Sequence, residues 1–261
     1  MLEWFTPQSS TWLHRVHPGL KFLLLFAMML ILFFNRQLGL NVIMACCYGG
    51  LLFVSSGYPA RKLLLLSLPF VLSFLSSALT LALFGRGETV LWQWGLVKIS
   101  EESIHAGLIL GFKSLAIGMI SLVLLLTTRL VPLFYALMQQ FRFPPKYAYP
   151  FLAAMRLVPT IIEEVQVRTH ALKVRGVVFS RGWRGVFQRL KLYGVPLFAQ
   201  SIRRAQRIAV AMEAKQFRMN QKRTYYYQTD FSKTDIGFLA YVAGTWLLWI
   251  LARLVEPDFP L

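Results

Sequence analysis

Five apolar stretches constrain the fold of this chain more than any other feature. The longest without a charged side chain is residues 63–84, and about 20 apolar residues suffice to cross a bilayer as a helix. Lipid offers no hydrogen-bond partners, so such stretches must satisfy their own backbone polar groups, as an α-helix does. The other stretches cover residues 21–34, 38–55, 103–128 and 235–254. They predict an all-α integral membrane protein with about five transmembrane helices, the first two paired as a hairpin.

The charge distribution separates these stretches from a basic segment. Of the 261 residues, 56% are hydrophobic, the mean hydropathy is +0.54 and the formal net charge is +17. Residues 129–233 contain 19 Lys or Arg against four acids and therefore carry +15 of that charge. Cytoplasmic segments of membrane proteins gather Lys and Arg. We therefore expect a cytoplasmic segment and no nucleic-acid partner.

These patterns predict three regions. Residues 1–128 form a membrane domain of four spans with the N-terminus inside, residues 129–234 a basic cytoplasmic domain with long amphipathic helices, and residues 235–261 a fifth span with the C-terminus outside. The bias of Lys and Arg agrees with this orientation at every loop. The polar stretch 85–102 is expected to be an external loop.

The basic segment contains two amphipathic helix patterns about 40 residues apart. The first, residues 155–176, has apolar residues at helical spacing and polar residues on the other face. In the second, residues 195–217, apolar residues recur in alternating steps of four and three, which is the seam of a helix that packs along another helix. Both end in Ala-x-x-x-basic, Ala171 to Arg175 and Ala211 to Lys215. They predict two parallel helix ends that serve as docking tips. The seam residues are Phe198, Ile202, Ala205, Ala209 and Met212.

Other candidate sites are weaker. Cys46 and Cys47 are adjacent within an apolar run, which favours packing over a disulfide or metal site. His14 and His17 lack a third metal ligand, so an interfacial anchor is the expected role. No Gly-x-x-x-x-Gly-Lys phosphate loop occurs in the sequence, and the first apolar run lacks the small-residue cleavage site of a signal peptide. We expect no catalytic residue, metal or cofactor.

Lys113 is the one charge deep inside an apolar stretch. It lies about 15 Å along the fourth span, where a lysine costs on the order of 2.5–3.5 kcal/mol, so it must face protein or water. It is either a charge on a transport path or an internal partner for a carbonyl or hydroxyl. The first alternative would make the chain a self-sufficient membrane carrier or membrane enzyme. The sequence leaves both open.

Residues 13–21 (Leu-His-Arg-Val-His-Pro-Gly-Leu-Lys) lead into the first predicted span, and residues 125–128 end the fourth. Residues 141–145 and 156–159, with Glu163 and Glu164, lie at the start of the basic segment, and Val174-Arg175-Gly176 ends its first amphipathic helix. In this order and spacing, these motifs resemble the transmembrane component of energy-coupling factor (ECF) transporters, the EcfT/CbiQ family of vitamin and metal importers. They are similar to the entry to its first span, the end of its fourth, the start of its coupling region and the first of two Ala-Arg-Gly motifs at the coupling-helix ends.

The resemblance implies a non-catalytic scaffold in a prokaryotic cell membrane. It would link two ATP-binding cassette ATPase subunits to a small membrane-embedded substrate-binding subunit, the S-component. Each docking tip would sit in a groove of one ATPase, and ATP-driven closure would move the coupling helices against each other. The resemblance leaves the cargo open among vitamins, their precursors and metal ions.

The second motif departs from the family pattern. Ala214-Lys215-Gln216 stands where Ala-Arg-Gly is usual, and lysine lacks the planar fork with which arginine grips a carboxylate. Gln216 also removes an easy helix stop. Arg218, one turn later, is a candidate for the missing guanidinium. We therefore expect the two tips to dock differently, as in a divergent subgroup with a dedicated or asymmetric ATPase pair.

Overall fold

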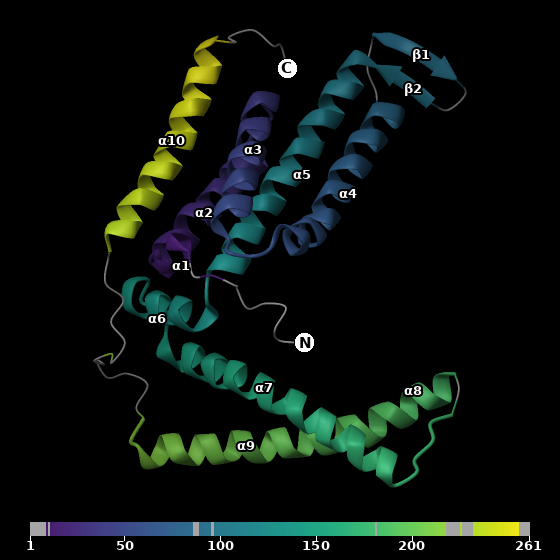
Figure 1. Cartoon of the computed structure of the whole chain (residues 1–261), viewed down its shortest axis with the longest axis vertical. Coiled ribbons are helices and arrows are strands. Elements are labelled where there is room, and N and C mark those ends of the chain that lie inside the picture. The colour runs from purple at the N-terminus through teal and green to yellow at the C-terminus, as the bar shows by residue number, and fades with distance from the viewer. Residues whose placement is uncertain are drawn as a thin grey trace. The chain divides into compact units, whose positions relative to one another are not determined.

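The computed structural model describes residues 9, 11–85, 89–94, 97–180, 182–217, 225 and 232–255 (Figure 1). The chain divides into two compact units: residues 1–137 with 228–261, which we call the membrane unit, and residues 138–227, which we call the coupling unit. The boundary after residue 137 falls inside helix α6 (Leu130–Gln140).

The membrane unit is built from the predicted apolar helices. Four of its helices, α3, α4, α5 and α10, are long and apolar enough to cross a bilayer, and α2 is a shorter apolar helix. The prediction of an all-α membrane protein is confirmed. The helices are α1 (Trp12–Arg15), α2 (Pro18–Phe34), α3 (Leu38–Ser55), α4 (Ala60–Phe84), α5 (Glu101–Thr127) and α10 (Lys233–Val255).

Helix α5 is the centre of this unit and packs against α2, α3 and α4 (Figure 1). Three of its glycines make the approach to α4 possible. A Cβ added at Gly107 would lie 2.7 Å from the Ala78 carbonyl oxygen, and one at Gly118 would lie 2.2 Å from the Phe70 ring. Small residues at these positions let the two backbones approach closely, as is common in membrane helix pairs.

A buried polar cluster ties residues 13–21 to the end of α5 and the beginning of α10. The Lys21 side chain is 1% exposed, and its Nζ donates to the Leu13 carbonyl oxygen at 2.5 Å and to the Thr127 carbonyl oxygen at 3.2 Å. The buried Asp235 carboxylate accepts from the His17 backbone N–H at 2.6 Å. His17 also caps α2, because its Nδ1 accepts from the Leu20 N–H. These satisfied groups fix residues 13–21 in place.

The polar stretch before α5 contains an antiparallel hairpin that the sequence analysis did not predict. Strand β1 (Val90–Trp94) pairs with β2 (Val97–Ser100), and Trp94 lies opposite Val97. Ser100 then begins α5, since its hydroxyl accepts from the Ser103 N–H. The expected irregular loop is therefore partly a β-ribbon.

The coupling unit contains two long helices and a short helix that leads into the second of them. Helix α7 (Pro145–Val174) is followed by α8 (Trp183–Arg189), a π-helical turn, η2 (Leu190–Gly194), and α9 (Val195–Ala214). Backbone helix continues without a break from α8 through η2 into α9, while α9 packs against α7. The proline at the start of α7 suits a first helical turn, where its missing N–H costs nothing.

Candidate functional site

The two docking tips end in the same backbone motif. At the first tip (residues 171–176) the Gly176 N–H donates to the Lys173 carbonyl oxygen at 3.0 Å, and the Val177 N–H donates to the Leu172 carbonyl oxygen at 3.1 Å. These paired bonds define a Schellman motif, which satisfies the last carbonyls of a helix. The cation at position 175 is the cap residue.

The second tip (residues 211–216) repeats this geometry forty residues later. The Gln216 N–H donates to the Glu213 carbonyl oxygen at 2.8 Å, and the Phe217 N–H donates to the Met212 carbonyl oxygen at 2.9 Å. Lys215 is its cap residue. Loss of the helix stop at Gln216 was expected, and that expectation is wrong: α9 ends at the position equivalent to the end of α7.

The residue that reverses the chain differs between the tips. Gly176 has φ +69° and Gln216 has φ +53°. Glycine adopts this left-handed conformation without a steric penalty, whereas a residue with a Cβ is strained there by roughly 1–2 kcal/mol. At the second tip, the Phe217 ring packs edge-on against Tyr149, with 5.5 Å between the ring centroids. This contact offsets part of the strain.

The tips lie at opposite ends of the helix pair. Tyr149 belongs to the first turns of α7, so the contact with Phe217 brings the end of α9 to the beginning of α7. Figure 1 shows α7 and α9 crossing as they run in opposite directions. The prediction of two parallel helix ends is therefore wrong. The coupling unit presents one cation at each end.

An ion pair marks the crossing of the two helices. The Glu164 carboxylate in α7 accepts from the Arg204 guanidinium of α9 and, at 2.8 Å, from the Gln200 Nε2. The Glu164 and Arg204 side chains are only 20% and 19% exposed. Glu164 lies eleven residues before Arg175, and Arg204 lies eleven residues before Lys215. Each tip is thus about 16 Å along its own helix from the crossing.

Sequence reasoning missed this pair. Glu164 was noted only as part of a family motif, and neither Gln200 nor Arg204 was singled out. The separation of 40 residues between Glu164 and Arg204 equals the separation between the tips. That shared offset does not by itself predict the contact, because it says neither that the two helices cross nor in which direction they run.

The α9 seam was expected to pack along another helix, but its two large side chains nearest the start of α9 are exposed. Phe198 is 72% exposed and Ile202 is 58% exposed. The polar residues Gln200 and Arg204 face α7 instead. The seam is therefore available for a contact outside the described chain.

The side chains named for docking at the tips are exposed, as a contact surface requires. Arg175 and Lys215 stand where helix carbonyls concentrate negative potential, a location that favours cations in general. The flanking alanines and glycine add little bulk, so another backbone could approach closely. Arg218 lies outside the described residues. The exposed tip residues are Ala171, Arg175, Gly176, Ala211, Ala214 and Lys215.

Lys113 lies in the membrane unit and has a defined partner. Its Nζ donates to the Phe33 carbonyl oxygen, at the end of α2, at 3.1 Å. This is the contact that an internal carbonyl partner requires. A role on a transport path stays a prediction.

Comparison with known proteins places this geometry in context. Residues 9–226 match the model of the CbiQ family, described as a cobalt transport protein. The chain is 31% identical over 262 aligned residues to the energy-coupling factor transporter transmembrane protein EcfT of Limosilactobacillus fermentum, with 96% of both chains covered. The EcfT protein of Bacillus selenitireducens is also 31% identical, over 97% of this chain and 95% of its own length.

Proposed function

The chain belongs to the EcfT/CbiQ family of transmembrane components of ECF transporters, and we propose that it couples ATP hydrolysis by partner ATPases to the uptake of a small solute. As a family member it is a multi-pass membrane protein and a non-catalytic transporter subunit. The proposed partners are two ATP-binding cassette ATPase subunits and a small membrane-embedded S-component. The proposed cargo is a vitamin, a vitamin precursor or a metal ion.

The observation that carries this proposal is the pair of matched tips. Each tip presents an exposed cation on a Schellman motif, eleven residues beyond an ion-paired crossing. A cation held at a helix end can enter an acidic groove with a defined orientation, and a guanidinium can bind a carboxylate with two bonds. Truncating one partner of such a desolvated pair costs about 2–5 kcal/mol.

The proposed cycle uses the crossing as a pivot. Closure of the ATPase pair on binding ATP would draw the two tips toward each other, and the helices would rotate about the contact between Glu164 and Arg204. That movement would reorient the S-component and release its cargo inside. The chain itself contributes positioning and force transmission, and its partners contribute hydrolysis and substrate recognition.

The cycle requires a defined orientation in the membrane. We propose that residues 129–234 are cytoplasmic, that the N-terminus is cytoplasmic, and that the protein lies in a prokaryotic plasma membrane. The excess of Lys and Arg in this segment supports the assignment. Sites for both ATPases would then lie on the side where ATP is available.

A self-sufficient carrier that uses Lys113 is the alternative. It predicts transport by the purified chain alone and loss of transport on Lys113→Ala. Because the Lys113 ammonium already donates to the Phe33 carbonyl oxygen, we expect Lys113→Met, which keeps the length of the side chain, to retain partner-dependent uptake. Uptake that needs Lys113 and no partner would favour the carrier.

Affinity purification of the chain from its native membrane tests the proposal directly. Two ATP-binding subunits and a small, very hydrophobic protein should be recovered with it, and the small protein would indicate the cargo class. Arg175→Glu should remove ATPase from the complex. Recovery of the chain alone, together with solute movement in vesicles containing only this chain, would overturn the proposal.

A further inference from the structure

Lys113 closes the end of a helix that is shorter than the bilayer core. Helix α2 has 17 residues and is about 25 Å long, whereas the hydrocarbon core is about 30 Å thick. The Phe33 carbonyl is one of the last four of α2, which have no partner within the helix. The Lys113 Nζ donates to this oxygen at 3.1 Å. This contact uses only one of the three hydrogens of the ammonium group.

Two lysine contacts fix where α2 ends along α5. The Lys21 Nζ at the start of α2 donates to the Thr127 carbonyl oxygen, and Lys113 donates to Phe33 near the end of α2. The two helices are therefore antiparallel, and Phe33 lies about 21 Å along α5 from Thr127. Beyond that level α5 continues for about 18 Å toward Glu101. The turn after α2, residues 35–37, thus lies beside the middle of α5, and we call it the α2 step.

A second cation lies on the α2 step. The turn consists of Asn35, Arg36 and Gln37, and the Arg36 side chain is exposed. Its positive charge acts on the Lys113 ammonium, so the two cations lie near each other and repel. The turn is held in place, because the Gln37 side-chain oxygen accepts from the Trp249 Nε1 of α10 at 3.3 Å. Helix packing therefore keeps Arg36 near Lys113.

Neither cation forms an ion pair with a residue that the structure describes. The one ion pair among those residues joins Glu164 to Arg204 in the coupling unit. Uncompensated charge is costly in apolar surroundings, and a like charge nearby raises that cost. Ionisable groups within membrane spans are therefore paired or reach polar surroundings. An anion that bridges Arg36 and Lys113 compensates both charges at once.

The apolar surroundings of the α2 step select the kind of anion. The Phe33 and Phe34 side chains are 65% and 79% exposed, and their rings meet edge-on with 5.4 Å between the centroids. About one turn earlier on α2 and on α5, Leu30 and Leu110 are also exposed. A phospholipid places its phosphate at the cations and its acyl chains along such side chains. A free phosphate ion gains nothing from the apolar groups.

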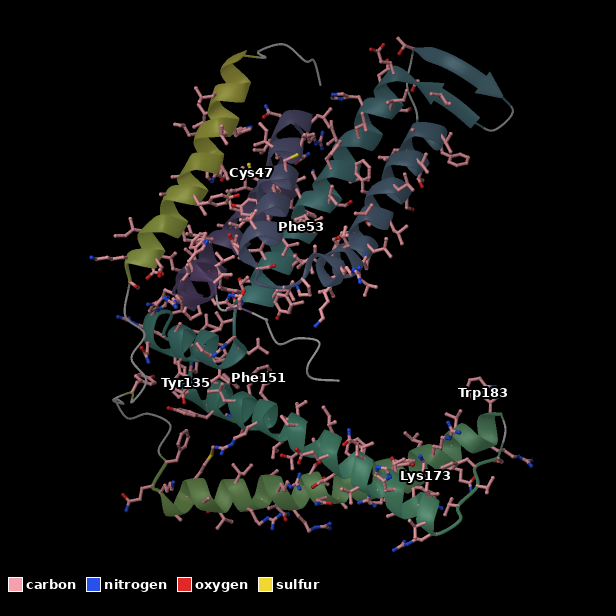
Figure 2. All side chains as sticks on the ribbon, in the orientation of Figure 1. Cys47, Phe53, Tyr135, Phe151, Lys173 and Trp183 are labelled. Atoms are coloured by element: carbon pink, nitrogen blue, oxygen red, sulfur yellow. The ribbon has the colours of Figure 1, made fainter. Side chains whose placement is uncertain are left out.

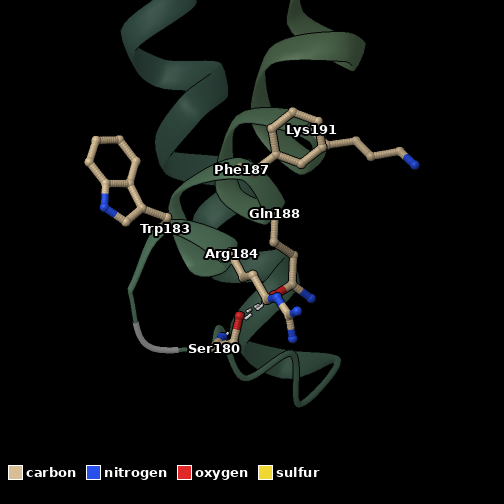
Figure 3. Close-up of a pocket in the computed structure, with 6 residues that line it drawn as sticks. All are labelled: Ser180, Trp183, Arg184, Phe187, Gln188 and Lys191. Atoms are coloured by element: carbon tan, nitrogen blue, oxygen red, sulfur yellow. Dashed lines mark hydrogen bonds between the residues drawn. The ribbon is translucent and has the colours of Figure 1, made fainter.

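Another group of cations and aromatic rings lacks this setting. The Trp183 side chain extends away from the ribbon of α8 (Figure 2), and it lines a shallow hollow of about 560 Å³ together with Arg184. Figure 3 shows the Trp183 ring and the Arg184 guanidinium on different sides of the helix. Arg184 is exposed and belongs to the basic segment, so it does not lie within an apolar span. The charge at Lys113 lies inside such a span and therefore requires compensation.

We propose that Arg36 and Lys113 together bind the phosphate of one anionic phospholipid, in the leaflet where α2 ends. Basic pockets between transmembrane helices bind anionic lipid head groups. Lys113 contacts the end of α2 and the phosphate with different hydrogens of one ammonium group, and the Arg36 guanidinium can bind two phosphate oxygens. A bilayer thins beside a short span, which brings head groups to this level. The bound lipid connects the α2 step to the middle of α5.

Native mass spectrometry of the purified full-length chain in detergent tests the proposal. Phosphatidylglycerol is titrated, with zwitterionic phosphatidylcholine as the comparison, and the dissociation constant of the first bound lipid is measured. Arg36→Gln removes one cation and leaves the contact between Lys113 and Phe33 in place. Arg61→Gln is the matched control, because Arg61 is an exposed arginine in the first turn of α4 and the net charge changes equally.

We expect the unchanged chain to bind its first phosphatidylglycerol about tenfold more tightly than its first phosphatidylcholine, as charge-assisted hydrogen bonds to phosphate allow. Arg36→Gln should lose most of this preference, and Arg61→Gln should keep it. Equal losses from both variants would overturn the proposal, because diffuse charge would then explain the attraction. An unchanged preference in Arg36→Gln would also overturn it.

Two substitutions at Lys113 separate its charge from its contact with α2. Lys113→Arg keeps the charge and should retain most of the lipid preference, whereas Lys113→Gln should reduce it about tenfold. Thermal unfolding of each variant without lipid shows whether the fold is intact. Full lipid preference in a folded Lys113→Gln variant would overturn the role of Lys113.

Competition with inorganic phosphate distinguishes a lipid from a soluble anion. At matched ionic strength, phosphate should displace no more phosphatidylglycerol than chloride does. Displacement by phosphate alone would assign the cation pair to a soluble anion and overturn lipid binding. The measurement needs no ATPase and no S-component, so its outcome is independent of the proposed coupling function.

Discussion

The two docking tips share a backbone and differ in the side chains that the backbone presents. Both helices end in a Schellman motif, with matching hydrogen bonds within 0.2 Å of each other. The first tip offers a guanidinium and a glycine turn, whereas the second offers an ammonium and a glutamine turn. Hydrogen bonding and packing around the helix end therefore set where each helix stops. The residue at the cap determines what the tip can bind.

The second tip therefore keeps the backbone shape of the first, at the cost of backbone strain at Gln216. Gln216 is held in a left-handed conformation, and the adjacent Phe217 is anchored on Tyr149. Packing of the neighbouring residue can maintain a turn that the turn residue itself disfavours. The cation therefore occupies the same position at both tips, although arginine and lysine differ in the hydrogen bonds that their side chains can donate.

Charge reversal at the tips should produce the largest effect. Arg175→Glu places a carboxylate against the proposed acidic groove, and we expect ATPase binding to weaken by at least about 100-fold, equivalent to roughly 3 kcal/mol. Uptake should be lost while the protein remains in the membrane. Lys215→Glu should weaken binding less, because an ammonium makes fewer directed bonds. Co-purification of the ATPases measures both changes.

Lys173→Glu is the matched control for net charge. Lys173 is exposed in the last turn of α7, two residues before Arg175 (Figure 2). We expect most ATPase binding to survive this reversal. An equal loss from Lys173→Glu and Arg175→Glu would mean that diffuse charge, rather than the tip geometry, attracts the partner.

Removing the ion pair at the crossing should change the positions of both tips relative to each other. Glu164→Gln leaves the largely buried Arg204 guanidinium without its carboxylate, which costs on the order of 1–3 kcal/mol. The distribution of distances between spin labels at positions 175 and 215, measured by double electron–electron resonance, should broaden.

Exchange of the two charges provides the rescue. Glu164→Arg combined with Arg204→Glu restores an ion pair at the crossing, so the distance distribution should narrow again. Gln200 would lose its acceptor in this variant, which makes full recovery unexpected. A distribution that stays narrow in Glu164→Gln would exclude the ion pair as the constraint at the crossing.

Exchange of the turn residues should give smaller shifts of opposite sign. Gly176→Ala adds a Cβ that has space, since no atom lies within 4 Å of it, but its backbone becomes strained by about 1 kcal/mol. Gln216→Gly relieves the same strain. Thermal unfolding of the purified chain should shift down by about 2–4 °C for the first variant and up by a smaller amount for the second. Unfolding temperatures that shift in the same direction for both variants would contradict the inference that the backbone is strained at Gln216 and relaxed at Gly176.

Exchange of the cations should have the smallest effect. Lys215→Arg gives the second tip the planar fork of the first, and we expect ATPase binding to tighten by roughly two- to fivefold, which is below about 1 kcal/mol. Cross-linking to the ATPases should be stronger from position 175 than from position 215 in the unchanged chain. Equal cross-linking from both positions would remove the argument for an asymmetric ATPase pair.

The sequence predicted the features that depend on local composition. Apolar length identified the membrane helices, because the bilayer imposes a minimum on each. The cap residues Arg175 and Lys215 followed from motif position. The antiparallel course of α7 and α9 did not, because a helix end carries no information about the direction of its neighbour. The contact between Glu164 and Arg204 depends on that direction and was missed with it.

Other features escaped because their signals are short or ambiguous. The β-hairpin alternates aromatic and β-branched residues over only a few positions, within a stretch whose polar ends favoured a loop. The helix stop at Gln216 contradicts residue preference and depends on the packing of Phe217. The π-helical turn shifts the helical period by one residue, which a single fixed period along the sequence does not show.

The equal spacing of both tips from the crossing has a mechanical consequence. Two arms of about 16 Å around one pivot form a lever of ratio one. A rotation of about 10° would displace each tip by about 3 Å, whichever tip is pushed. Both tips would therefore travel equal distances when the two helices turn against each other about the crossing. The two ATPases would then bind their tips with different affinity, yet both tips would be displaced by the same distance.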